Sequence, residues 1–193
     1  VASWTVGLTV RPSSFAVAAV QACGATTAWD PDSSNNVATL SLAEANAWSS
    51  RDVPKRSDGR SPMVSGLLLP SSVPVGDLNV RLHLDQGRSG KASLYLVSPR
   101  GVAVPLLTGR HTNGRPLGIA CTPRADRLLT FDDQSPYRIE DALPPFVGSY
   151  QTTSRRLSRF NGQSAAGWWW LVVLDADRGA TLECWGLDLI PSP

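Results

Sequence analysis

Two pairs of aspartates in this chain could hold a hard cation. Asp132 and Asp133 follow the strand-like stretch from Leu128 to Phe131, and Asp175 and Asp177 stand in a predicted C-terminal turn. Calcium prefers clustered carboxylate and carbonyl oxygens that turns hold in place, so these four residues are candidate calcium ligands. Aspartates also cap turns by accepting hydrogen bonds from nearby backbone N–H groups, and this structural role is the alternative at both pairs.

A third acidic stretch, Asp30-x-Asp32-x-Ser34, imitates the start of an EF-hand loop. The pattern then breaks down, because Asn35 replaces the central glycine and Ser41 replaces the closing glutamate. Without those two residues the loop can neither turn sharply nor close around an ion. We therefore interpret this stretch as a turn.

Catalytic chemistry has few candidate residues. His83 and His111 are the only histidines, no cysteine stands near either of them in the sequence, and there is no G-x-S-x-G nucleophile motif. His83 falls on the polar face of an alternating strand and His111 in a loop, both of which are typical of surface histidines. The sequence predicts no catalytic site in this chain.

The three cysteines, Cys23, Cys121 and Cys184, form no CxxC pair and have no neighbouring histidine pair, so a zinc site is not expected. If the protein is exported, one disulfide could form, for example between Cys121 and Cys184. The alternative is three small buried hydrophobic side chains.

Three consecutive tryptophans could form a binding surface. On one strand, Trp168, Trp169 and Trp170 must point alternately to opposite faces, so one set turns away from the core that the other fills. An uncovered Trp168 and Trp170 could stack on sugar rings, as the aromatic platforms of carbohydrate-binding modules do. The alternative is that another layer or loop covers both faces.

The element that carries these tryptophans is predicted to be the first strand of a β-hairpin buried on both faces. The apolar run from Trp168 to Leu174 is bounded by glycine on one side and by an Asp/Gly-rich turn on the other. A second strand is expected from Leu182 to Ile190, where Leu182 is out of phase with the later apolar positions. This shift predicts a β-bulge near Cys184.

Other segments also predict strands. Apolar and polar residues alternate from Leu78 to Asp85 and again from Ala92 to Leu96, with Gly/Pro turns after each. Helix signals are weak, with one short helical turn expected from Ala43 to Trp48, and Arg51 to Pro62 has the composition of a linker. Many short strands with such turns predict an all-β protein with two antiparallel sheets packed as a sandwich.

Length and charge narrow the function classes. The 193 residues can bury a substantial core, and 18 basic against 16 acidic residues leave a net charge of only +2, which argues against nucleic-acid binding. No apolar run approaches the roughly 20 residues of a membrane span, and the start has no export-signal pattern, so no membrane insertion is expected.

A basic cluster at Arg155, Arg156 and Arg159 could meet an acidic partner or be a solvated loop.

Several motifs follow one another at characteristic spacings in the last two thirds of the chain. In order, they are Ser98-Pro99-x-Gly101, Thr130-Phe131-Asp132-Asp133, Gly148-x-Tyr150, Leu157-x-x-Phe160-Asn161-Gly162, Gly167-x-Trp169-x-Leu171, Asp175 and Leu182-x-x-Trp185-x-Leu187. Their order and spacing resemble the P domain (P/Homo B domain) of kexin- and furin-like subtilisin-type proprotein convertases. The similarity extends from Pro62 to Ile190, and we assign the P-domain-like β-sandwich to residues 62–191.

This resemblance implies a jelly-roll β-sandwich without catalytic activity of its own. It also implies a partner in the same parent chain, an adjacent subtilisin-like protease domain that the module stabilises, and an extracellular or cell-surface location. One position departs from the family, because Lys91 stands where P domains commonly carry the aspartate of a Gly-Asp-Leu motif. A lysine cannot ligate a cation, so this departure weighs against calcium.

The amino-terminal segment contains the motif Asp30-Pro31-x-x-x-Asn35-Asn36-x-Ala38-Thr39. With this motif, residues 1–42 resemble the tail of an Ig-like repeat of bacterial surface proteins. We expect the last strands of the repeat at Val6 to Val10, within Phe15 to Thr27 and at Val37 to Leu42. Residues 43–61 then form a linker. Because this upstream segment looks like a surface repeat, a carbohydrate-binding or surface-adhesion module with no protease in the parent is the alternative function.

Overall fold

The computed structural model describes residues 46–70, 72–86, 91–108, 114–121 and 127–192, together with the backbone of residues 18–23 and 37–42. The chain divides into two compact units, Val1–Glu44 and Ala45–Pro193. Within the described part of the chain, no helix has the length and apolar character needed to span a membrane.

The described part of the first unit is an antiparallel strand pair. Strand β1 (Ala18–Cys23) lies beside β2 (Val37–Leu42), and their register runs from Ala18 opposite Leu42 to Cys23 opposite Val37. The strand predicted at Val37 to Leu42 is therefore confirmed. The segments Val6 to Val10 and Asp30 to Ser34 lie outside the described residues.

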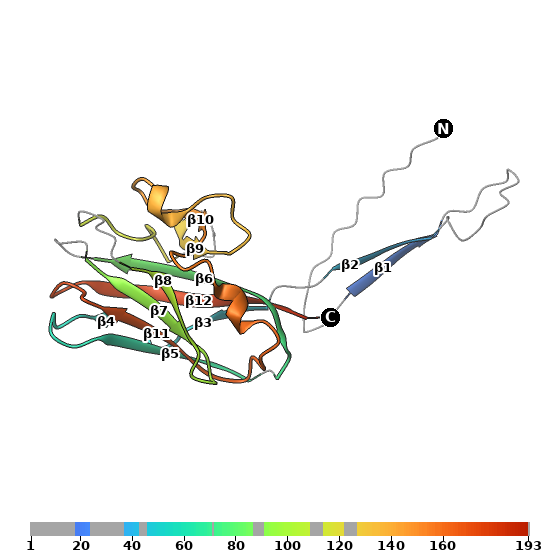
Figure 1. Ribbon diagram of the computed structural model, residues 1–193, viewed down its shortest axis with the longest axis horizontal. Helices are drawn as coiled ribbons and strands as arrows, with labels where there is room; N and C mark the ends of the chain where they lie inside the picture. Colours follow the sequence, from blue (N-terminus) through green and yellow to red (C-terminus); the bar gives the residue numbers. More distant parts are fainter. Residues whose placement is uncertain are drawn as a thin grey trace, which may run out of the picture. The chain divides into compact units, whose positions relative to one another are not determined.

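The second unit is a sandwich of two β-sheets (Figure 1). One sheet has the strand order β10-β9-β6-β12-β3, with β4 also paired to β12, and the other has the order β5-β11-β7-β8. All pairs are antiparallel except β9 with β10. The strands are β3 (Asn46–Ser49), β4 (Lys55–Arg56), β5 (Met63–Leu69), β6 (Val75–Asp85), β7 (Ser93–Val97), β8 (Ala103–Leu107), β9 (Leu129–Phe131), β10 (Gly148–Tyr150), β11 (Gly167–Leu174) and β12 (Thr181–Pro191).

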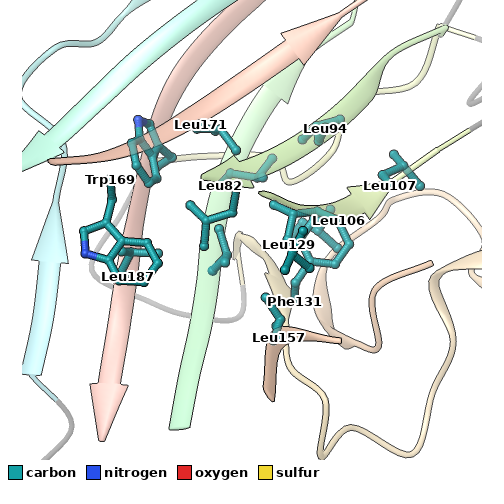
Figure 2. Packing of buried hydrophobic residues seen from close by; sticks show 14 of the residues in the cluster. Leu82, Leu94, Leu106, Leu107, Leu129, Phe131, Leu157, Trp169, Leu171 and Leu187 are labelled. Atoms are coloured by element: carbon teal, nitrogen blue, oxygen red, sulfur yellow. The ribbon is translucent and has the colours of Figure 1, made fainter. Parts of the chain in front are cut away.

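The core fills the space between the sheets with side chains from alternate strand positions. On β6, Leu78, Val80, Leu82 and Leu84 are buried, and on β11 so are Trp169 and every second residue after it. Figure 2 shows part of this cluster, with labelled side chains from strands of both sheets and with Leu157 from the short 3-10 helix Leu157–Phe160. This alternation comes directly from the period of two in a strand, and the predicted all-β sandwich is confirmed.

The predicted C-terminal hairpin is correct in its strands but wrong in its pairing. Strand β11 pairs with β5 and β7, whereas β12 pairs with β6, β3 and β4 in the opposite sheet. The connection from 175 to 180 therefore crosses from one sheet to the other. The predicted bulge is confirmed, because the β12–β6 register shifts between Leu182 and Cys184. The expectation that β11 is buried on both faces is wrong, since Trp168 and Trp170 are exposed.

The segment interpreted as a linker, residues 43–61, instead supplies β3 and β4, both paired with β12. Residue Ser50 continues this attachment by donating its backbone N–H to the Trp185 carbonyl at 2.9 Å. The helical turn expected up to Trp48 is likewise a strand at residues 46–49. Short, polar and proline-containing segments are typical of linkers, but they also occur as edge strands. Residues 46–49 and 55–56 are strands of this second kind.

Candidate functional site

The side chains of the three consecutive tryptophans point alternately to opposite faces of β11, as predicted. Trp169 is fully buried, while 49% of Trp168 and 37% of Trp170 is exposed to solvent. The buried indole donates its N–H to the Ala165 carbonyl at 2.9 Å and packs edge-on against Phe160, with 5.1 Å between ring centroids. The core thus fixes Trp169, and strand alternation then places its two neighbours on the outer face of β11.

The two outer indoles stack on one another above a glycine. Their ring centroids lie 5.4 Å apart at an interplanar angle of 20°. Gly66 of β5 is the cross-strand partner of Trp170, and a Cβ placed there would lie 2.9 Å from Cζ3 of Trp170 and 3.1 Å from Cε3 of Trp168. The missing side chain at Gly66 therefore gives both rings room to lie close to the sheet.

Two aliphatic side chains extend the apolar area. On the same face of β5, Leu68 lies opposite Trp168 and is 52% exposed, and Val64 is 39% exposed. We call Val64, Gly66, Leu68, Trp168 and Trp170 the tryptophan surface. It gathers four of the exposed large apolar side chains of the described residues on one pair of strands, which distinguishes it from singly scattered surface apolar residues.

A groove of about 1050 Å³ borders the tryptophan surface. Trp168, Trp170 and Leu68 line one part of it, and Trp48, Arg51 and Asp52 line another. Neither exposed indole nitrogen makes a hydrogen bond with any residue that the structure describes. The groove therefore combines apolar ring surface with unused N–H donors and with charged groups at its rim, a mixture typical of binding sites.

The free edge of β5 beside this groove is covered by side chains. Gly66 donates its N–H to Asp52 Oδ2 at 3.1 Å, and Lys55 Nζ donates to the Val64 carbonyl at 2.7 Å. Asp52 and Lys55 also pair with each other at 2.8 Å, and the Lys55 hydrogen bond, followed by the Gly66 N–H, lowers the pKa of Asp52. Ser50 Oγ donates to the Gly66 carbonyl at 2.7 Å. An incoming strand would find these edge positions already occupied.

The first pair of candidate calcium ligands accepts hydrogen bonds from both near and distant residues. Asp132 Oδ1 accepts from the Gln134 N–H at 2.7 Å and its Oδ2 from the Ser149 hydroxyl at 3.1 Å. Asp133 Oδ2 accepts from the Ser158 N–H at 3.0 Å, and its Oδ1 is buried without a partner among the described residues. Only the contact with Gln134 is that of a turn-capping carboxylate, whereas the other two join separate segments of the chain.

The second pair lies in the β11–β12 connection. Asp175 has a φ of 56° and is exposed, and the Asp177 carbonyl accepts a hydrogen bond from the Ala180 N–H at 3.0 Å. Nowhere in the described part of the chain do three or more His, Cys, Asp or Glu side chains gather as metal ligands would. The structure thus brings the aspartates together only as chain neighbours, and calcium binding stays a prediction.

A disulfide joins Cys121 to Cys184, with 6.0 Å between their Cα atoms. His83 lies opposite Cys184 on β6, and its Nδ1 is 3.8 Å from Cys121 Sγ. Burial lowers the pKa of His83, while Glu183 and Asp85 act to raise it. This contact between His83 and Cys121 could not be predicted from the sequence, because the two residues are far apart in it. It does not form a nucleophile pair, because a sulfur in a disulfide has no thiolate. His111 lies outside the described residues.

Several residues of the tryptophan surface were not expected from the sequence. Strand β5 reads MVSGLLL, whose apolar residues do not alternate cleanly, so neither Val64 nor Leu68 was identified as exposed. The signal that could have found the site is Gly66, because a glycine inside a strand often marks a close approach by another group.

Comparison with solved structures finds similarity to a bacterial serine protease. No protein-family model matches the chain, and no curated protein does. The crystal structure of a serine protease of Aeromonas sobria is similar with a TM-score of 0.44 and 17% identity, over 76% of this chain and 26% of that one. The complex of the A. sobria serine protease with a chaperone gives a TM-score of 0.44 and 18% identity, over 77% and 26%. The chain thus spans about a quarter of the length of these structures.

Proposed function

We propose that this chain is a non-catalytic accessory module that packs against an adjacent domain of its parent protein through the tryptophan surface. The observation that supports the proposal is the pair of half-exposed indoles on the outer face of β11, beside exposed Leu68 and Val64. A contiguous apolar surface rimmed by charged side chains is typical of interaction sites. Tryptophan is enriched in the centres of protein interfaces, where it contributes much of the binding energy.

The adjacent domain that we propose is a subtilisin-like serine protease domain, as the resemblance of residues 62–191 to the P domain implies. In this role the module stabilises the protease and takes no part in its chemistry. The Cys121–Cys184 disulfide supports an extracellular or cell-surface location, because disulfides persist mainly in oxidising compartments.

The test compares the melting temperature of the neighbouring domain in three proteins: the natural fusion, the fusion carrying Trp168→Ser and Trp170→Ser, and the neighbouring domain alone. We expect the double variant to melt near the isolated domain, because the interface loses its apolar centre. Leu143→Ser is the matched control, since Leu143 is an exposed apolar residue on a different segment. Equal melting temperatures in the three proteins would refute the proposal.

Carbohydrate binding is the second candidate, and the groove beside the tryptophan surface is the observation that favours it. A sugar ring could stack on an indole and hydrogen-bond to Arg51 or Asp52 at the rim. It ranks second because the indoles stack on each other, which takes up one ring face of each. Retention on an insoluble polysaccharide that is lost in Trp168→Ala would establish it in place of domain packing.

A surface-adhesion role shares the same residues. Binding to a separate protein or cell-wall partner, in a parent that encodes no protease, would replace the proposed protease domain as the occupant of the tryptophan surface. The reading frame that contains this chain decides between these two occupants directly.

A further inference from the structure

A second groove, of about 890 Å³, lies between the end of β4 and the β11–β12 connection. Its lining shares no residue with the tryptophan surface, which is centred on the pairs Trp168–Leu68 and Trp170–Gly66. The second groove is lined by residues 56–60 and by Arg178 and Gly179. Three of these residues are arginines, Arg56, Arg60 and Arg178, and we call it the arginine groove.

Two segments far apart in the sequence, residues 56–60 and the β11–β12 connection, form this groove, and hydrogen bonds join them. Ser57 donates its N–H to the Ala180 carbonyl at 2.8 Å, and Gly179 donates back to the Ser57 carbonyl at 3.0 Å. The Ser57 hydroxyl donates to the Ala176 carbonyl at 3.2 Å. The segment that follows β4 is therefore fixed against the β11–β12 connection, and the arginines of both segments line one groove.

Two glycines make the close approach feasible. Gly59 has a φ of +72°, and a Cβ there would lie 2.8 Å from Cβ of Arg178, so this turn packs directly on the Arg178 backbone. Gly179 has a φ of +89°, and a Cβ there would lie 3.3 Å from Nη2 of Arg56. The Arg56 guanidinium thus lies over bare backbone, which defines its position at the groove wall.

The positive charge of the groove is not neutralised within the described residues. None of the three arginines forms an ion pair with a described residue, whereas Lys55 pairs with Asp52 and Arg81 with Asp188 elsewhere. The groove has one acid, Asp58, whose Oδ1 accepts the N–H groups of Ser61 and Arg60, both at 2.8 Å. These two hydrogen bonds, that of Ser61 first, lower the pKa of Asp58. Its carboxylate therefore stabilises the turn, and three guanidinium groups face solvent.

We propose that the arginine groove binds an acidic peptide segment through the carboxylates of its Asp or Glu side chains. The planar guanidinium fork matches a carboxylate with two parallel hydrogen bonds, which favours arginine over lysine at such sites. The volume of about 890 Å³ exceeds the needs of a single small anion and has room for several residues of an extended chain.

The lining favours a peptide over an acidic polysaccharide. None of the residues around the arginine groove is aromatic, so a sugar ring would find no stacking partner there. The tryptophan surface has the opposite composition, with stacked indoles and aliphatic neighbours. The two sites therefore recognise different chemistry, and this proposal is independent of the proposed domain packing.

The test measures binding of fluorescein-labelled hexaglutamate to the whole chain by fluorescence anisotropy at low and at physiological salt. We expect Arg56→Gln with Arg178→Gln to weaken binding by roughly 10-fold, because each of the two lost charge-assisted contacts contributes about 3-fold at an exposed position. The matched control is Arg100→Gln with Arg138→Gln, which removes the same charge from exposed arginines elsewhere and should change binding by less than about 2-fold.

A second variant separates charge from geometry and guards against misfolding. Arg56→Lys with Arg178→Lys keeps both charges, so we expect intermediate binding if the guanidinium forks matter. No binding of hexaglutamate to the unaltered chain, or equal losses in the Arg100/Arg138 control, would overturn the proposal. Heparin binding that is stronger than hexaglutamate binding and is lost in the same glutamine variant would overturn the peptide assignment in favour of a sulfated polysaccharide.

Discussion

The Cys121–Cys184 disulfide should supply a large share of the stability of residues 45–193. It ties the segment before β9 to the bulge of β12 across a sequence separation of 63 residues. In the loop-entropy description, opening a loop of this size raises the entropy of the unfolded chain by about 14 cal/mol/K, which is about 4 kcal/mol at 25 °C. Replacing both cysteines by serine should therefore lower the free energy of unfolding by about that amount.

The assay is urea unfolding followed by tryptophan fluorescence, because the buried Trp169 and Trp185 report on loss of the core. The same loss should lower the melting temperature by roughly 8 to 16 °C, since 1 kcal/mol shifts a domain of this size by roughly 2 to 4 °C. Cys23→Ser is the matched control, because it removes a cysteine outside the disulfide. A reductant should reproduce the loss in the unaltered chain and have no effect on the double variant.

A loss below about 1 kcal/mol in Cys121→Ser with Cys184→Ser would refute the reasoning. Such a small loss would have one of two meanings. Either the segments around Cys121 and Cys184 already stay close together in the unfolded chain, or the folded state adopts a different geometry once the disulfide is absent. An equal loss in Cys23→Ser would also contradict the prediction, because that change opens no loop.

Three further predictions follow from the described contacts. Burial lowers the pKa of His83, so the unfolded chain binds more protons near pH 6.5, and the free energy of unfolding should fall as pH drops from 7 through that value; His83→Gln should flatten this dependence. Calcium held by Asp132 and Asp133 should raise the melting temperature above its value in a chelator, because a ligand that binds only the folded state stabilises it and because the buried Asp133 Oδ1 has no hydrogen-bond partner among the described residues; equal melting temperatures would contradict the calcium prediction. Gly66→Ala should weaken the exciton signal of the stacked indoles in circular dichroism while costing less than about 1 kcal/mol, because exposed rings can move aside; an unchanged signal would contradict the stacking.

The strands could be predicted from the sequence, but their partners could not. Alternation along β6 and the apolar run of β11 give the period of two that any strand with one buried face must show. The same period says nothing about which strand lies alongside, since that depends on where the 175–180 connection directs the chain. A short, turn-rich connection is compatible both with a hairpin and with a crossing between sheets. The prediction that β11 and β12 pair as a hairpin is therefore wrong even though both strands are correct.

The candidate sites were predictable only in part for a related reason. Trp168 and Trp170 were identified because alternation is local, whereas Leu68 joins them only through the register of β5 with β11. The arginine groove could not be predicted from the sequence, because backbone hydrogen bonds between distant segments bring Arg56 and Arg178 to the same site. The composition of residues 43–61 pointed to a linker, which hid both β4 and the groove.

The way in which the edge of β5 is covered narrows what the tryptophan surface can do. An exposed edge strand would invite a partner to add a strand, with backbone hydrogen bonds as the main attraction. Here Asp52, Lys55 and Ser50 already occupy the outward N–H and carbonyl groups at Val64 and Gly66. A partner must therefore bind through side chains, by covering the indoles and Leu68 with apolar surface of its own. That requirement fits the packed face of a neighbouring domain better than an extended peptide.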